Sequence, residues 1–211
     1  MLKRILAATG LAMFVVTGAA QAQQFQEGTH YRVLERSQST VDDERIELRE
    51  FFSYACPFCH QFYPVINNYM RGAPDDVVLV HHPVVFRDDW EPLARAYFVA
   101  EQLDIVDDVH GAIFVAYHEE NMRLRSVGDA QELFTRYADV DADAVADAWD
   151  SFGVETSLRR YDRSARVYGV RATPSLGVNG KYYTDARMAG GADELLQVVD
   201  YLIERERQAG Q

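Results

Sequence analysis

The chain has 211 residues and carries 33 acidic against 21 basic side chains, which gives a formal net charge of −12 at pH 7. This acidic balance argues against binding to nucleic acid or to anionic lipid, because both expose negative phosphates that Lys and Arg neutralise. A chain of this length can bury one substantial core, or build a domain that carries a large insertion. It contains two cysteines, at positions 56 and 59.

The first 22 residues have the pattern of a signal peptide. Lys3 and Arg4 precede an apolar run over residues 5–16, and Ala-Gln-Ala at residues 20–22 supplies the small residues of a cleavage site. The apolar run is too short for a membrane-spanning helix, which needs ~20 residues. We expect residues 1–22 to be removed on export, which takes away two positive charges and moves the net charge from −12 to −14. Since the chain has no Asn-x-Ser/Thr acceptor, a bacterial periplasm fits better than an endoplasmic reticulum lumen.

Apolar periodicity predicts strands and one helix in the first part of the mature chain. A strand-like alternation runs into Phe51 and Phe52, as expected of a strand that enters the interior. From Pro57 onwards the apolar residues recur at helical spacing, and Gly72 is a helix-stop signal. The predicted elements are strands over residues 31–34 and 45–54, a helix over residues 57–72, and a strand over residues 77–86.

The middle of the chain is predicted to be helical, and its end to return to strands. Asn179-Gly180 is the strongest hairpin signal, because this pair suits a tight turn between antiparallel strands. The predicted elements are several helices within residues 89–152, a helix over residues 155–168, strands over residues 174–178 and 181–184, and a last helix over residues 192–207.

This order of elements predicts an α/β fold, in which a mixed sheet has helices on both faces. The helical run separates the first strands from the hairpin, so we predict that it forms an inserted all-helical domain. The predicted domains are a sheet domain over residues 23–88 and 156–211 and a helical domain over residues 89–155.

The two cysteines lie in Cys56-Pro57-Phe58-Cys59, between the second predicted strand and the first predicted helix. A thiol-disulfide exchanger needs one exposed, stabilised thiolate and a second thiol that resolves the mixed disulfide. We expect Cys56 at the helix N-cap and Pro57 at the first helical position, where its missing N–H costs nothing. The helix dipole and the free amides then lower the pKa of the Cys56 thiol below its usual ~8.5. Cys59 lies one turn further on and is expected to be more buried, so we predict that Cys56 exchanges and Cys59 resolves.

Other uses of the cysteine pair compete with thiol exchange. A structural metal site needs about four ligands, which two cysteines without a histidine cluster cannot supply, so we predict no metal site. A two-coordinate copper carrier remains an alternative. A purely structural disulfide is disfavoured, because closing so short a loop removes little entropy from the unfolded chain.

Thr173-Pro174 directly precedes the predicted hairpin and is the second element of the predicted site. A proline at the start of a strand cannot donate to the ladder, and an X-Pro bond adopts the cis form at modest cost. A cis bond here would present the Thr173 backbone beside the reactive sulfur. An extended substrate could then pair with that backbone by strand addition.

Together these motifs resemble the DsbA family of thiol:disulfide interchange proteins, within the thioredoxin superfamily. The resemblance covers nearly the whole mature chain, including its helical insertion. It also implies a thioredoxin-like fold and a cis Pro174 that faces the disulfide. The motifs that carry it are Glu-Phe-Phe-Ser-Tyr-x-Cys-Pro-x-Cys over residues 50–59, Gly-Val-x-x-Thr-Pro over residues 169–174, and Val-Asn-Gly-Lys-Tyr over residues 178–182.

The resemblance also implies an activity and partners. The Cys56–Cys59 disulfide is expected to be donated to reduced, unfolded proteins newly exported to the periplasm, with no cofactor besides the disulfide itself. A DsbB-like membrane quinone reductase is expected to reoxidise the pair, and the chain is expected to be a monomer.

Two positions depart from the family pattern. Family members typically carry histidine where this chain has Phe58, and a phenyl ring offers the Cys56 thiolate no charge or donor, so we expect a less oxidising disulfide than with histidine there. Glu50 stands where the family has a buried acid, and His81 takes the position that often supplies a lysine. If Glu50 and His81 pair, proton transfer near Cys59 depends on pH in the range of histidine. Otherwise, His81 or His82 is simply a satisfied sheet residue.

Rival functions remain within and outside enzymes. A disulfide isomerase or reductase usually adds an N-terminal dimerisation domain, whereas few residues precede the first predicted strand here. Outside enzymes, the alternative functions are a chaperone and a thiol-dependent metal carrier.

Overall fold

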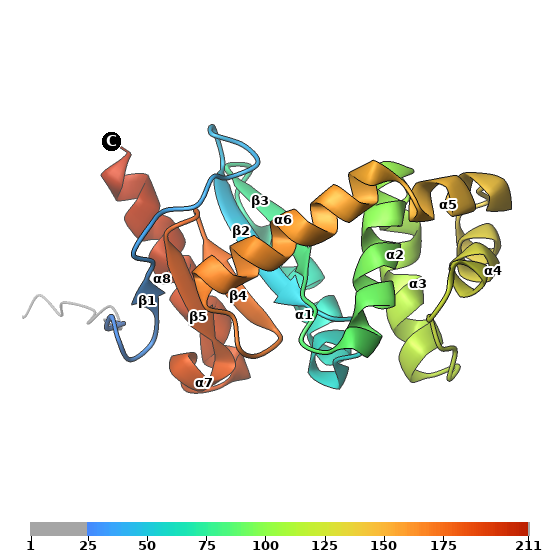
Figure 1. Cartoon of the computed structure of the whole chain (residues 1–211). Coiled ribbons are helices and arrows are strands. Elements are labelled where there is room, and N and C mark those ends of the chain that lie inside the picture. Colours follow the sequence, from blue (N-terminus) through green and yellow to red (C-terminus); the bar gives the residue numbers. More distant parts are fainter. Residues whose placement is uncertain (1–24, 211) are drawn as a thin grey trace, which may run out of the picture.

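The computed structural model describes residues 25–210, so the predicted signal peptide over residues 1–22 lies outside the described part of the chain. The described residues form a mixed five-stranded sheet with helices on both faces and a group of helices beside it (Figure 1). The strands are β1 (Arg32–Val33), β2 (Ile46–Phe52), β3 (Val77–Pro83), β4 (Ser175–Val178) and β5 (Tyr182–Asp185). The helices are α1 (Pro57–Gly72), α2 (Glu91–Gln102), α3 (Val106–His118), α4 (Val127–Tyr137), α5 (Ala142–Trp149), α6 (Phe152–Tyr168), α7 (Ala186–Ala189) and α8 (Ala192–Ala209), with a 3-10 turn at Asp88–Trp90. None of the helices within residues 25–210 is long and apolar enough to cross a membrane.

Strand β2 lies between β3 and β4 and leads directly into the cysteine motif. The strand order is β1-β5-β4-β2-β3, and β2 runs parallel to β3 but antiparallel to β4. In this register Glu50 of β2 lies opposite His81 of β3 and opposite Leu176 of β4. Partners in register point to the same face of a sheet, so the strand pairing by itself places Glu50 and His81 side by side.

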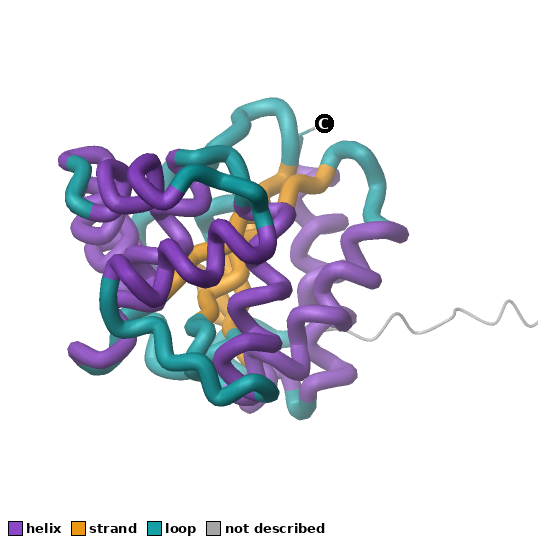
Figure 2. Tube along the Cα trace, turned by 90° about the vertical axis from the view of Figure 1, so that its right-hand side faces the viewer, coloured by secondary structure: helices purple, strands orange, loops and turns teal. Residues whose placement is uncertain are grey.

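Apolar clusters hold helices against both faces of the sheet. On one face, α1 and α8 pack around the fully buried Ile66, Val198 and Leu202. On the other face, α6 covers the sheet through Tyr168, whose ring packs on that of Phe51 with centroids 4.8 Å apart. Figure 2 shows the strands enclosed between helices.

The largest cluster lies among the helices that follow β3 and reaches back to the end of β2. The buried Phe114 of α3 packs edge-to-face on Tyr54, with ring centroids 4.9 Å apart, and also against Phe52. Cys56 and Cys59 belong to the same cluster. The helical part of the chain therefore packs directly against the cysteine motif.

The observed structure confirms the predicted fold class and the predicted order of strands and helices, while strand β3 is shorter than predicted. It ends at Pro83 rather than at residue 86, because its partner β2 ends at Phe52. The last bond between the two segments joins the N–H of Val84 to the Phe52 carbonyl at 2.9 Å. Beyond it the chain has no partner strand and turns into the 3-10 turn.

One helix boundary and one additional helix also differ from the prediction, and each has a capping residue. Helix α6 begins at Phe152 because the Ser151 hydroxyl accepts the N–H of Val154. The short helix α7 was not predicted, and it starts where the Asp185 carboxylate accepts the N–H of Met188 at 2.9 Å. The predicted domain boundaries, between residues 88 and 89 and between residues 155 and 156, stay a prediction; α6 crosses the second of them as one continuous helix.

The contact between the helices and the cysteine motif predicts a large stability cost for Phe114→Ala. Emptying this buried position should lower the free energy of unfolding by ~3–5 kcal/mol in urea denaturation. The matched control is Phe152→Ala, since the Phe152 side chain is 80% exposed, and it should change the free energy by less than ~0.5 kcal/mol. Equal losses for the two variants would contradict the packing described here.

Candidate active site

Cys56 lies at the junction between the sheet and helix α1. After β2 the backbone makes a turn in which the N–H of Cys56 donates to the Ser53 carbonyl at 3.0 Å. Cys56 is the N-cap of α1 and Pro57 is the first helical residue, as predicted. The Cys56 carbonyl accepts the N–H groups of Cys59 and His60, both at 3.1 Å. The Cys56 sulfur therefore lies at the positive end of the helix.

The two sulfurs, which are free thiols in this structure, have different surroundings. Cys56 is 7% exposed, whereas Cys59 is completely buried. A hydrogen bond from the Cys59 thiol lowers the pKa of Cys56 to about 6, with help from Thr173 and from the backbone N–H groups of Cys59 and Phe58 and against the effect of partial burial. Burial raises the pKa of the Cys59 thiol far above its usual range, and the hydrogen bond to Cys56 raises it further. At neutral pH, Cys56 is therefore mainly a thiolate when reduced, and Cys59 is a thiol.

Thr173 and Pro174 lie against the Cys56 sulfur, although 117 positions separate Thr173 from Cys56 in the sequence. The Thr173–Pro174 peptide bond is cis. The Cys56 sulfur lies 3.4 Å from the Thr173 carbonyl oxygen, so the backbone before strand β4 faces the reactive sulfur. This is the placement that the sequence predicted for a substrate-binding backbone.

An apolar groove runs beside the cysteine motif. It has a volume of about 500 Å³ and lies between α1, the Thr173–Pro174 turn and the start of α8. Phe58 lies at its edge and is 66% exposed, which is unusual for a large apolar side chain. Phe62 and Val65 of α1 continue the same wall. An extended chain segment with apolar side chains could occupy this groove within reach of Cys56.

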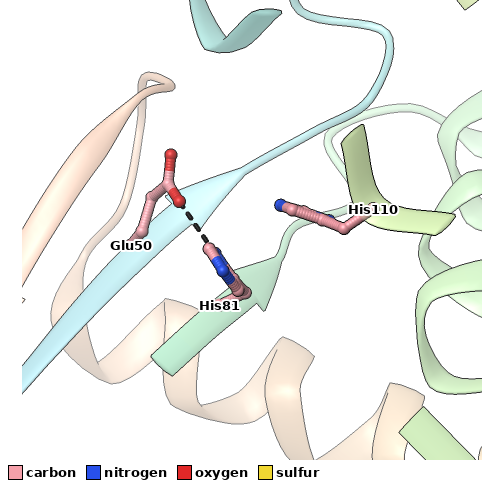
Figure 3. Close-up of side chains that lie close together, drawn as sticks. All are labelled: Glu50, His81 and His110. Carbon is pink, nitrogen blue, oxygen red and sulfur yellow. Dashed lines mark hydrogen bonds and ion pairs between the residues drawn. The ribbon is translucent and has the colours of Figure 1, made fainter. Parts of the chain in front are cut away.

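Glu50 and His81 form the pair that their register predicts. Oε2 of Glu50 lies 2.9 Å from Nδ1 of His81, as the dashed line in Figure 3 marks. The Glu50 side chain is buried, and its charge contributes to the high pKa of Cys59, after the effects of burial and of Cys56. His82 is instead a satisfied sheet residue, because its Nε2 lies 2.9 Å from the Tyr161 carbonyl. The expected pH dependence of proton transfer near Cys59 stays a prediction.

The sequence did not indicate His110, which approaches the Glu50–His81 pair from helix α3 (Figure 3). Its ring is buried, and burial lowers the pKa of His110 well below its usual value. Nδ1 of His110 lies 2.6 Å from the Tyr54 hydroxyl, whereas its Nε2 has no hydrogen-bond partner among residues 25–210. The available signal was a histidine on the apolar face that Val109 and Ile113 define, a pattern that core histidines share.

Comparisons with known proteins agree with this geometry. The family model described as a DSBA-like thioredoxin domain matches residues 86–203. The thiol:disulfide interchange protein DsbA of Pseudomonas aeruginosa is 32% identical over 209 residues, which cover 99% of each chain. DsbA of Azotobacter vinelandii is 33% identical over 206 residues, which cover 97% of this chain and 96% of that one. The crystal structure of Pseudomonas aeruginosa DsbA superposes with a TM-score of 0.82 at 31% identity and covers 88% of this chain and 96% of that one.

The fold, the cysteine motif and the relatives thus lead to one assignment. The mixed sheet with its helical insertion is the arrangement found in the DsbA structures, and the resemblance expected from the motifs is confirmed. The chain belongs to the DsbA family and is a thiol-disulfide oxidoreductase with a thioredoxin-like fold.

Proposed function

We propose that this protein oxidises newly exported proteins by donating the Cys56–Cys59 disulfide through a mixed disulfide at Cys56. The observation that carries the proposal is the contrast between the two sulfurs. The Cys56 side chain is 7% exposed and its thiol has a pKa of about 6, while Cys59 is completely buried and its thiol has a strongly raised pKa.

The exchange proceeds in two displacement steps. A substrate thiolate attacks the Cys56 sulfur, the Cys56–Cys59 bond breaks, and its electron pair leaves on the Cys59 sulfur, which takes up a proton. A second substrate thiolate then attacks the substrate sulfur of the mixed disulfide, and Cys56 leaves as a thiolate. The substrate is oxidised to a disulfide, and the cysteine pair is reduced by two electrons.

Once the mixed disulfide has formed, the two pKa values favour its onward reaction with the substrate. A sulfur with a low pKa leaves faster, so the second step is favoured by the low pKa of Cys56. A thiol is a poor nucleophile, and the raised pKa of Cys59 keeps this sulfur protonated, so its return attack on the mixed disulfide is slow. Transfer of the disulfide to the substrate therefore competes well with its return to Cys59.

The residues around the cysteines support the exchange in this proposal. Pro57 starts α1 without an unpaired N–H, and the Thr173 carbonyl beside the sulfur offers an acceptor to an extended substrate, next to Pro174. Phe58 contributes an exposed apolar surface at the mouth of the groove. Glu50, held by His81, adds negative charge beneath Cys59 and so helps to keep that sulfur protonated.

We further propose that the substrates are reduced, unfolded proteins in the periplasm and that the protein acts there as a monomer. The signal-peptide pattern of residues 1–22 supports export. Each round leaves the cysteine pair with two extra electrons, so a further oxidant is required. A DsbB-like quinone reductase in the membrane would supply this oxidant. In this proposal the protein needs no cofactor besides its own disulfide.

Stoichiometric oxidation of a reduced, unfolded protein with two cysteines tests this function. The oxidised protein should convert the substrate to its disulfide, one equivalent for each bond, and Cys56→Ser should abolish the reaction. An isomerase would act only on a substrate with scrambled disulfides. A metal carrier would act on neither the reduced nor the scrambled substrate. A second test uses the disulfide formed by two copies of a peptide that has one cysteine. The Cys59→Ser variant should form a mixed disulfide with this peptide, and the Cys56→Ser variant should not. Equal yields of mixed disulfide from the two variants would contradict the assigned roles.

The reactivity of Cys56 should follow a midpoint pH of about 6. Below this value the alkylation rate of the reduced protein should fall about tenfold for each pH unit, because only the thiolate reacts. Since the Cys59 thiol is the largest contributor to the low pKa, Cys59→Ala should move the midpoint upwards. Rates measured by mass spectrometry from pH 4 to pH 9 check both statements. A midpoint unchanged in Cys59→Ala would argue against the hydrogen bond as the cause.

Replacing Phe58 by histidine should make the protein a stronger oxidant. The imidazole would stand near the Cys56 thiolate as a donor or a cation, which favours the charged form of the sulfur. The pKa of Cys56 should therefore fall, and the reduction potential of the disulfide should rise. The control is Phe58→Leu, which keeps an apolar side chain at this exposed position and should leave the pKa unchanged. Thiolate absorbance measured against pH gives the pKa of Cys56 in each protein. Equal pKa values for the wild type and Phe58→His would refute the idea.

A further inference from the structure

We propose that Glu50, His81 and His110 form a binding site for a divalent first-row transition-metal ion of the Zn²⁺ type, beneath the cysteine pair. The three side chains come from β2, β3 and α3, and one potential ligand atom of each lies within 4.8 Å of the other two. This site uses neither cysteine as a ligand, although it shares Glu50 with the surroundings of Cys59. It also goes beyond the sequence prediction, which weighed metal binding at the cysteines and predicted no metal site.

The geometry is close to what a metal ion needs. Glu50 and His81 are already 2.9 Å apart, and the rings of His81 and His110 have centroids 4.3 Å apart. Zn²⁺ binds nitrogen and oxygen at ~2.0–2.2 Å, so two ligand atoms in its tetrahedral shell lie roughly 3.4 Å apart. The widest separation must therefore shrink by about 1.4 Å, which rotations of the imidazole rings can supply. Figure 3 shows the three side chains converging on one region from three elements.

The free nitrogen of His110 is the observation that points to a ligand. The ring is 3% exposed, and its Nε2 is buried without a hydrogen-bond partner in the part of the chain that the structure describes. A buried polar atom without a partner is costly, so it is rarely left so without a reason. A metal ion would use the lone pair of this nitrogen.

The Tyr54 hydroxyl offers His110 the hydrogen bond by which a metal-binding imidazole is oriented. It lies 2.6 Å from Nδ1, so this nitrogen can carry the proton and donate it to the phenol oxygen. The lone pair is then on Nε2, which faces the other two side chains. Histidine ligands in metal sites are usually oriented by such a hydrogen bond from their second nitrogen.

The charge and chemistry of the three groups select the class of ion. Within the described residues, His81 is the one hydrogen-bond or ion-pair partner of the buried Glu50 carboxylate. A divalent cation would compensate this carboxylate, whose burial is otherwise expensive. Two imidazoles and one carboxylate suit Zn²⁺ and its neighbours better than Mg²⁺ or Ca²⁺, which prefer oxygen ligands. The His81 side chain is 17% exposed, which gives an ion a way in from solvent and leaves room for a water ligand.

The test uses the oxidised, metal-free protein, in which the Cys56–Cys59 disulfide removes both thiolates as ligands. Titration calorimetry with Zn²⁺ should show one equivalent bound. Co²⁺ should give visible ligand-field absorption without sulfur-to-metal charge transfer, and Zn²⁺ should displace it. X-ray absorption of the wild-type Zn²⁺ complex should show two imidazoles, and this result does not depend on any variant folding.

Variants assign the site to these residues. His110→Gln and Glu50→Gln should each weaken Zn²⁺ binding by more than about 100-fold while retaining the far-UV circular dichroism of the wild type. His60→Gln is the matched control, because His60 belongs to a separate group with Glu119, at 3.4 Å, and should bind Zn²⁺ like the wild type. No stoichiometric binding to the oxidised wild type, a zinc shell of carboxylates only, or full affinity in His110→Gln would overturn the proposal. Thiol oxidation measured without metal is unaffected by any of these outcomes, so this test and that of the proposed function fail independently.

Discussion

The chemistry of this protein depends on where the turn after β2 places two sulfurs three residues apart. The turn makes Cys56 the N-cap of α1, and the helix then carries Cys59 into the fully buried space between the helical insertion and the sheet. The hydrogen bond between the two sulfurs lowers the pKa of one and raises that of the other. One short turn therefore separates a stable thiolate from a protonated thiol.

The rest of the fold keeps this junction in place and supplies its surroundings. The parallel pairing of β2 and β3 places Glu50 beside His81 beneath the cysteines, and the antiparallel pairing of β2 with β4 brings Thr173 to the Cys56 sulfur. Helix α3 of the insertion closes the remaining side through Phe114. The insertion thus completes the core behind the active site and contributes the buried His110.

Much of this arrangement was predictable from local pattern, while the rest depends on packing between distant elements. The position of Cys56 at a helix start follows from the proline after it, and the hairpin follows from Asn179-Gly180. The predicted end of β3 was wrong because the end of this strand depends on where its partner β2 stops. His110 was missed because its sequence neighbours show only that it is buried. Its position opposite Glu50 arises from the packing of α3 on the sheet, which periodicity cannot specify.

The measurement that tests the central claim most directly is the equilibrium of the Cys56–Cys59 disulfide with glutathione. A stabilised Cys56 thiolate favours the reduced form of the pair, which makes the disulfide an oxidant. The account predicts a reduction potential above that of the glutathione couple, so that the protein is mostly reduced in an excess of glutathione buffer poised at the potential of that couple. A potential below that of glutathione would mean that the disulfide is the stable form, and it would contradict the role of the protein as a disulfide donor.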